Sequence, residues 1–265
     1  VKAIVVPMGA EKYSRKEIDR LTEMAKKYHA SGLAWLKVNE AGLSGSFVKY
    51  ISEENSQKIT GQLALKHNDL VLIVADTWEN ANFALGALRL QVAKEMDLID
   101  QQQFNFLWVV DWPLFEYSEE EKRYVAAHHP FTAPKDDQVD LMLTQPEKVH
   151  AKAYDIVLNG YELGGGSIRI HNQEIQNRMF KAIGMLDEEI EQQFSFFTDA
   201  LKYGTPPHGG IALGFDRIAM LLTYNTSLRE VIAFPKAASA RCLMSDAPSR
   251  VSERQLKELG IKIDE

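Results

Sequence analysis

The 265-residue sequence has a single cysteine, Cys242, and no long apolar run. One thiol excludes an internal disulfide framework and a zinc site built from cysteines alone, and it favours a reducing compartment. The longest apolar run, Leu70–Ala75, is far shorter than the ~18 residues needed to cross a bilayer. Positive charge is also scarce, since 30 Lys and Arg stand against 37 Asp and Glu. This balance disfavours non-specific nucleic-acid binding by the whole chain but leaves a local RNA-contacting patch open.

The composition of the whole sequence is that of an ordinary globular protein. Apolar residues make up 45% and charged residues 25%, which is too apolar for a disordered chain and enough for a full core in one or two domains. A polar, glutamine-rich stretch at 97–105 divides the chain into two parts. We therefore expect a compact α+β module over 1–100 and a second domain over 101–265.

Apolar periodicity and turn residues predict the secondary structure of both parts. In the first, Ser14 followed by Glu17 predicts a capped helix start. In the second, strands follow one another without regular crossover helices, which favours an antiparallel β-sheet flanked by helices. The predicted strands are 3–6, 33–38, 70–75, 106–110, 154–158, 164–170, 211–213 and 232–234, the predicted helices are 14–28, 56–65, 80–98, 175–184, 187–203 and 215–222, and 41–45 is predicted to be a glycine-rich turn.

Two adjacent histidines, His128 and His129, precede a proline in a loop between strand signals. Neighbouring residues in an extended segment point in opposite directions, so the pair is not expected to form one metal site unaided. At least one ring is able to face a pocket and donate to a carboxylate or phosphate. On local pattern alone, a surface or packed loop histidine explains the pair as well.

Three successive glycines, Gly164–Gly166, interrupt a strand-like run. Glycine is costly inside a strand and usually marks a bulge or the close approach of another group. A bulge here would bring Glu162 and Arg169 to one pocket floor, where the arginine would grip a carboxylate and Glu162 a metal ion or a ribose hydroxyl. The alternative is a flexible glycine hairpin with a Glu–Arg surface pair.

A Pro-Pro-His-Gly-Gly loop at 206–210 enters the short strand 211–213, and Gly214 stands where strand meets helix. Asp216 and Arg217 fall in the first helical turn, where an anion is attracted both by the arginine and by the helix N-terminus. A plain helix start would account for Asp216, but not for the whole series of glycines.

These three clusters, in this order, resemble the C-terminal part of bacterial-type aspartyl-tRNA synthetases, which are class II enzymes. The run 210–217 (GIALGFDR) is similar to class II motif 3, apart from Ala212 and Asp216, where glycine and glutamate are common in the class. Both departures are familiar in the aspartyl branch, as are 128–132 (HHPFT), 160–171 and 200–208. The first hundred residues resemble the GAD domain, which these enzymes insert between motifs 2 and 3.

The resemblance implies aspartate–tRNA ligase activity: ATP activates L-aspartate to aspartyl-adenylate, which then acylates tRNA. The partners implied are L-aspartate, ATP with Mg²⁺, and tRNA(Asp), with tRNA(Asn) left open, in a cytoplasmic homodimer and without a membrane. The residues implied are Arg217 and Glu162 for catalysis; His128, His129 and Arg169 for aspartate; Glu162, Gly214, Phe215, Asp216 and Arg217 for ATP; Gly164, Gly165 and Gly166 for the pocket floor; and Glu162 for Mg²⁺ through ATP.

The sequence shows no anticodon-binding barrel and neither motif 1 nor motif 2. It also begins at Val1 and enters an apolar run at once, as a chain cut just before or inside a strand would. We therefore expect a C-terminal fragment that has little or no aminoacylation activity alone.

Three other readings remain open. An asparaginyl or lysyl enzyme is the nearest, but a lysine pocket should carry a carboxylate where this chain has Arg169. A non-catalytic RNA- or protein-binding module is the second, since 1–100 holds no residue that looks catalytic. The third is another class II synthetase-like enzyme that makes adenylates without tRNA.

Overall fold

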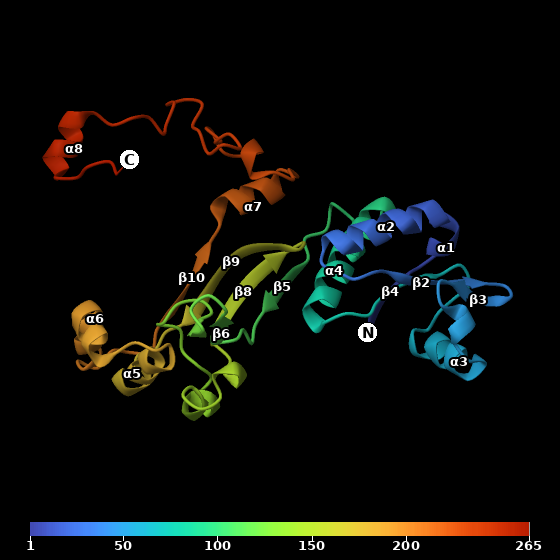
Figure 1. Ribbon diagram of the computed structural model, residues 1–265, viewed down its shortest axis with the longest axis horizontal. Coiled ribbons are helices and arrows are strands. Elements are labelled where there is room, and N and C mark those ends of the chain that lie inside the picture. The colour runs from blue at the N-terminus through green and yellow to red at the C-terminus, as the bar shows by residue number, and fades with distance from the viewer. Residues whose placement is uncertain (265) are drawn as a thin grey trace. The chain divides into compact units, whose positions relative to one another are not determined.

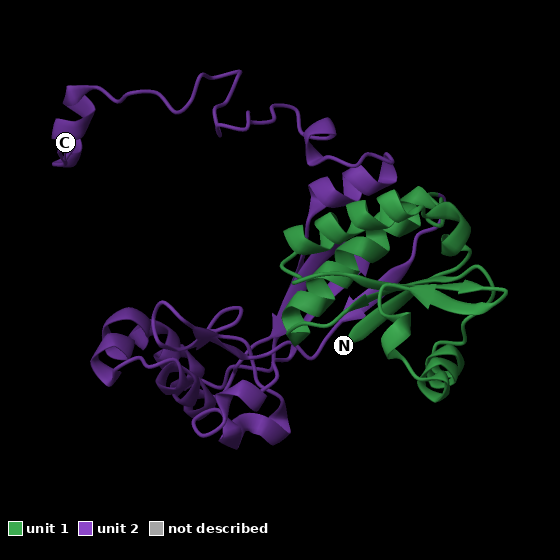
Figure 2. Cartoon of the chain, turned by 45° about the vertical axis from the view of Figure 1, so that its right-hand side comes forward, with its two compact units in different colours: residues 1–101 green, residues 102–265 purple. Residues whose placement is uncertain are grey.

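The computed structural model describes residues 1–264, which divide between two compact units, Val1–Gln101 and Gln102–Glu265. Figure 2 distinguishes the two units by colour. Both combine antiparallel strands with helices (Figure 1), so the α+β class is confirmed. Within residues 1–264, no helix is long and apolar enough to cross a membrane.

The first unit contains a four-stranded sheet in the order β1-β4-β2-β3, in which every neighbouring pair is antiparallel. β4 is central and almost fully buried, as its apolar sequence LVLIV requires. Helices α2 and α4 pack against each other, and their apolar faces form a core with the sheet. The elements are β1 (Lys2–Val6), α1 (Gly9–Lys12), α2 (Arg15–Lys27), β2 (Ala34–Asn39), β3 (Gly42–Gly45), η1 (Val48–Tyr50), α3 (Glu53–Gln62), β4 (Leu70–Val74) and α4 (Trp78–Glu95).

The predicted start of α2 is confirmed as a complete capping box. The Glu17 amide donates to the Ser14 hydroxyl at 3.4 Å, and the Ser14 amide donates to the Glu17 carboxylate at 2.6 Å. The glycine-rich turn predicted at 41–45 is wrong, because Gly42–Gly45 pairs with β2 as the edge strand β3. A turn composition misleads here since the short hairpin leaves only two residues, 40 and 41, between the paired strands.

The second unit is built on an antiparallel sheet in the order β10-β9-β8-β5. Helices α5 and α6 belong to a second cluster of buried residues beside the β6–β7 hairpin (Figure 1). The elements are β5 (Phe106–Val109), β6 (Phe115–Ser118), β7 (Arg123–Ala126), η2 (Asp136–Leu141), η3 (Pro146–Lys148), β8 (Ala153–Leu158), β9 (Tyr161–Ile168), α5 (Gln173–Ala182), α6 (Asp187–Leu201), β10 (Gly209–Leu213), α7 (Phe215–Leu222), η4 (Leu228–Glu230) and α8 (Glu253–Leu259).

Two features of this unit differ from the predicted elements. The strand expected at 232–234 is wrong, because residue 232 has no regular structure and residues 233–234 form a bend. The hairpin β6–β7 was not predicted, since its polar sequences FEYS and RYVA carry little apolar alternation. Helix α7, by contrast, has the predicted bounds 215–222.

Candidate active-site cavity

Strand β9 carries a bulge immediately before its glycines. Ile156 of β8 pairs with Gly164, whereas the next residue, Val157, pairs with Glu162, so Leu163 is an extra residue on β9. A bulge of this kind shifts the alternation of side chains by one position. Glu162 therefore lies on the same face as Gly165 and Ser167, which pair with β8 residues of that face. The predicted bulge is present, one residue ahead of the glycine run.

The three glycines are needed because both neighbouring strands come close to β9. A Cβ atom on Gly164 or Gly166 would lie less than 3.0 Å from a backbone oxygen of β10. A Cβ on Gly165 would collide instead with the carboxylate of Asp155 on β8. These glycines are therefore explained by the close approach of neighbouring strands. The alternative, a flexible glycine hairpin, does not describe them.

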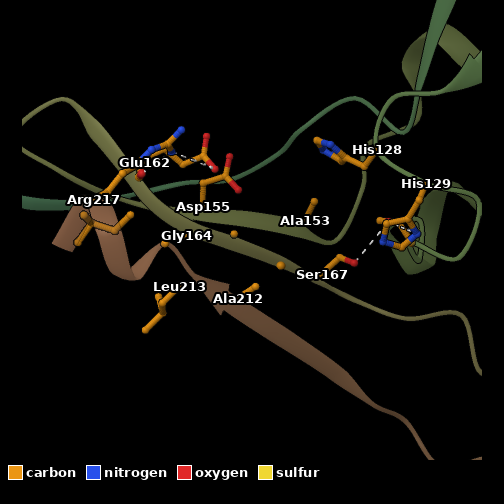
Figure 3. A pocket seen from close by; sticks show the side chains of 15 residues that line it. His128, His129, Ala153, Asp155, Glu162, Gly164, Ser167, Ala212, Leu213 and Arg217 are labelled. Atoms are coloured by element: carbon orange, nitrogen blue, oxygen red, sulfur yellow. Dashed lines mark hydrogen bonds and ion pairs between the residues drawn. The ribbon is translucent and has the colours of Figure 1, made fainter. Parts of the chain in front are cut away.

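A cavity of about 500 Å³ opens over this part of the sheet (Figure 3). It draws residues from all three sequence clusters, which come from the 128–132 loop, β8, β9, β10 and the start of α7. The lining residues are His128, His129, Thr132, Ala153, Asp155, Glu162, Leu163, Gly164, Gly165, Gly166, Ser167, Ala212, Leu213, Gly214 and Arg217.

One end of the cavity gathers two carboxylates and an arginine. The Arg217 guanidinium donates to the Glu162 backbone carbonyl at 2.7 Å and lies 3.9 Å from the Glu162 carboxylate. Figure 3 shows Asp155 beside this pair. Burial raises the pKa of Asp155 above its ordinary value, and the negative charge of Glu162 raises it further. This end therefore combines a cation that can meet phosphate oxygens with two carboxylates that repel each other.

Asp155 is a site residue that the sequence analysis missed. It stands in a predicted strand, and the register of β8 against β9 is what aims it at Gly165. The alternation of β8 alone marks one face, but the partner strand is needed to know which face meets the cavity.

The residues at the start of α7 divide into two groups. Gly214 follows β10 and is the N-cap residue of α7. Its amide donates to the Leu163 carbonyl at 2.6 Å, and it lines the cavity together with Arg217. Phe215 and Asp216 are exposed and do not line the cavity, although both were predicted as ATP-binding residues. The side chains of one helical turn point in different directions, so only part of the turn faces the cavity.

The other end of the cavity holds the two histidines. The His128 ring stands edge-on to Trp112, with ring centroids 5.6 Å apart. Nδ1 of His129 lies 3.0 Å from Nη1 of the Arg169 guanidinium. Both histidines line the cavity although they are adjacent, and each has different partners. Burial lowers the pKa of His129, and the positive charges of Arg169 and His128 lower it further.

Arg169 stands just beyond the end of β9 and reaches the site through His129, since it does not itself line the cavity. No Asp or Glu among residues 1–264 forms an ion pair with it. The predicted meeting of Glu162 and Arg169 on one pocket floor is therefore not seen, because Glu162 lines the cavity whereas Arg169 contacts it only through His129.

Comparison with known proteins assigns the chain to a family. Residues 10–238 match the family model described as tRNA synthetases class II (D, K and N). The chain belongs to that family. This class II synthetase segment is 58% identical over 264 residues to an aspartate–tRNA ligase of Macrococcus caseolyticus. It is 56% identical over 263 residues to an aspartate–tRNA ligase of Staphylococcus saprophyticus. It is 57% identical over 263 residues to an aspartate–tRNA(Asp/Asn) ligase of Bacillus mycoides.

The matches cover 99–100% of this synthetase segment but only 44–45% of each relative. The chain thus spans a little under half the length of the curated relatives that it matches.

Proposed function

We propose that this chain acts as part of a longer aspartate–tRNA ligase, in which ATP activates L-aspartate to aspartyl-adenylate and the aspartyl group is transferred to tRNA(Asp). The observation that carries the proposal is the division of the cavity, with Arg217 and two carboxylates at one end and, at the other, His129, which the Arg169 guanidinium contacts from behind the cavity lining. A nucleotide phosphate fits the first end, and an acidic amino acid fits the second. The 56–58% identity to ligases of this name supports the same assignment.

At the phosphate end, Arg217 would stabilise charge that develops on the phosphate oxygens as the aspartate carboxylate attacks the α-phosphate and pyrophosphate leaves. Gly214 has no side chain to project into the cavity, so that a flat nucleotide can lie against the backbone beside β10. The glycine floor at 164–166 leaves the cavity open between the two ends. Aspartate and ATP would then be held in line, which lowers the barrier mainly by positioning.

Mg²⁺ fits the same end of the cavity. Glu162 raises the pKa of Asp155, and a divalent cation would relieve the repulsion between the two carboxylates. Residues 1–264 contain no group of three or more His, Cys, Asp or Glu that could hold a metal ion. Magnesium commonly takes one or two protein carboxylates and completes its shell with phosphate oxygens and water, where it neutralises phosphate charge. We propose that Glu162, with Asp155 beside it, serves in this way once ATP is bound.

At the amino-acid end, Arg169 is proposed to bind the side-chain carboxylate of aspartate through two parallel hydrogen bonds. Asparagine would be rejected because its amide offers one acceptor and points N–H groups at the guanidinium. His128 and His129 are proposed to complete this end of the pocket.

The remaining parts of the proposal concern the whole protein. Unit 1 is proposed to be the GAD insertion domain, which the chain carries ahead of the motif 3 part of the catalytic domain. The parent enzyme is proposed to be a homodimer, as the family resemblance implies, and to act in the cytoplasm, where tRNA is charged. Whether it also charges tRNA(Asn) is open, since relatives of nearly equal identity carry both names.

The test compares two arginine variants in the full-length ligase that carries this segment. Arg169→Leu removes the proposed carboxylate ligand, whereas Arg178→Leu removes an arginine of α5 that pairs with Asp140 and Glu174 on the surface. Loss of charge-assisted hydrogen bonds predicts that Arg169→Leu raises the KM for aspartate ~100-fold or more in ATP–pyrophosphate exchange, with little change in the KM for ATP. If the two variants behave alike, aspartate is not read by Arg169.

A further inference from the structure

The ring nitrogen Nδ1 of His129 contacts a backbone amide and a guanidinium, which are both hydrogen-bond donors. Nδ1 accepts a hydrogen bond from the Phe131 backbone amide at 3.2 Å and lies 3.0 Å from Nη1 of Arg169. A guanidinium and a backbone amide can only donate, so Nδ1 must carry a lone pair. The ring proton is therefore on Nε2, and His129 is neutral.

Beside the ring lies the Thr132 hydroxyl, which is followed by the Ser167 hydroxyl. The Thr132 hydroxyl lies 3.3 Å from Nε2 and 3.5 Å from Nδ1 of His129, and 3.4 Å from the hydroxyl of Ser167. With the proton on Nε2, Thr132 keeps its own proton for Ser167, whose hydroxyl lies 3.4 Å away. Both hydroxyl residues are buried, with 0% and 3% exposure, so this arrangement is shielded from water.

The backbone ties the two segments together. Thr132 and Arg169 form an antiparallel bridge, the Ala133 amide donates to the Ile168 carbonyl at 2.9 Å, and the Ile170 amide donates to the Phe131 carbonyl at 2.9 Å. The histidine and the arginine are thus carried by two paired backbone segments, which limits how far either can move from the other.

We propose that His129 is a positioning residue that holds the Arg169 guanidinium by accepting one of its N–H groups at Nδ1. This inference rests on the proposed function, in which Arg169 binds the side chain of aspartate. It assigns His129 to Arg169, whereas the family resemblance implied a direct role in binding aspartate.

The choice of a neutral acceptor has a consequence for specificity. A carboxylate in the same place would orient Arg169 equally well, but it would neutralise the guanidinium and weaken its attraction for an anionic side chain. A neutral imidazole fixes one N–H and leaves the full positive charge and the remaining N–H groups for the ligand. Holding the arginine with a histidine therefore favours aspartate over asparagine.

The first experiment uses four variants of the full-length ligase in ATP–pyrophosphate exchange. His129→Leu removes the acceptor, His129→Asn keeps an acceptor oxygen near the place of Nδ1, His129→Asp keeps the acceptor but adds a negative charge, and His67→Leu changes an exposed histidine of unit 1. Loss of one hydrogen bond to a charged group predicts that His129→Leu raises the KM for aspartate about tenfold. We expect kcat and the KM for ATP to change less than twofold.

His129→Asn is expected to restore the aspartate KM to within about threefold of wild type, and His67→Leu to leave it unchanged. His129→Asp is expected to lower the preference for aspartate over asparagine about tenfold. An unchanged KM in His129→Leu overturns the proposal, as does a His129→Asn variant no better than His129→Leu or a loss shared equally by ATP. If Arg169→Leu raises the aspartate KM while His129→Leu does not, the positioning role fails and the proposed function stands; if Arg169→Leu has no effect, the proposed function fails.

The second experiment does not depend on activity. Two-bond ¹H–¹⁵N correlation spectra of the chain report the tautomer of each histidine, and the His129→Asn spectrum identifies the signals of His129. The arrangement predicts the Nε2–H tautomer from pH 8 down to below the ordinary pKa of histidine, since burial, Arg169 and His128 all lower the pKa of this ring. A proton on Nδ1, or an imidazolium at neutral pH, overturns the proposal.

Discussion

Gly166→Ala should loosen the strand pair that carries the phosphate end of the site. A methyl group on Gly166 would lie less than 3.0 Å from the carbonyl carbon and oxygen of Gly210, with the Ile211 Cα atom 3.0 Å away, and all three atoms are backbone. Backbone in a ladder cannot turn aside as a side chain does, so β10 must move away from β9. Overpacking of this kind costs about 1–3 kcal/mol. We expect the variant to be destabilised by ~2 kcal/mol, which lowers Tm by roughly 4–8 °C in a unit of this size.

Gly210→Ala is the matched control, because a Cβ at Gly210 meets no atom within 4 Å and its φ angle is not positive. It changes the same residue type in the neighbouring strand, and its Tm should stay within about 2 °C of wild type, with any shift upward, since alanine restricts the unfolded chain. Scanning calorimetry of the two variants measures the difference. Equal Tm values would refute the close approach of β9 and β10 on which the cavity depends.

Three further predictions concern single side chains. Arg217→Ala is expected to raise the KM for ATP ~10–100-fold in the full-length ligase, because a charged hydrogen-bond donor is lost; an unchanged KM in pyrophosphate exchange would contradict its role. Glu162→Gln is expected to lower the raised pKa of Asp155 only part of the way, because burial is the larger cause, and ¹³C carboxyl titration checks this; no shift would mean that the two do not interact. Ser14→Ala should destabilise the chain by about 1 kcal/mol in urea unfolding, because the helix cap is lost. An unaltered urea midpoint would show that the capping box with Glu17 does not stabilise the fold.

The raised pKa of Asp155 also gives stability a pH dependence of known sign. The folded protein holds this proton more tightly than the unfolded chain does, so the carboxyl contributes stability below its ordinary pKa. That contribution is lost as the pH rises through the raised folded value. The opposite holds for His129, whose lowered pKa means that stability is full above the ordinary histidine pKa and falls as the pH drops below it.

Local sequence signals predicted the parts of the fold that depend on local chemistry. The capping box of α2, the bounds of α7 and the presence of a bulge beside Gly164–Gly166 follow from residues close together in the chain. The glycines are informative because each excludes a side chain for a reason that the partner strands explain.

What depended on pairing partners was harder to predict. Asp155 was missed because its aim at the cavity is set by the register of β8 against β9. The edge strand β3 was taken for a turn, and 232–234 was taken for a strand, since glycine content and a short apolar run do not reveal whether a neighbouring strand is present. Phe215 and Asp216 were predicted as ATP-binding residues from their motif, and they are exposed residues that do not line this cavity.

The most direct test of the central claim, that this site reads an aspartyl side chain, is calorimetric titration of the full-length ligase with a non-hydrolysable aspartyl-adenylate analogue and its asparaginyl counterpart. The account predicts that the aspartyl analogue binds at least ~100-fold more tightly, and that Arg169→Leu abolishes this preference while leaving the nucleotide part of the affinity in place. Equal binding of the two analogues to the wild-type enzyme would contradict it.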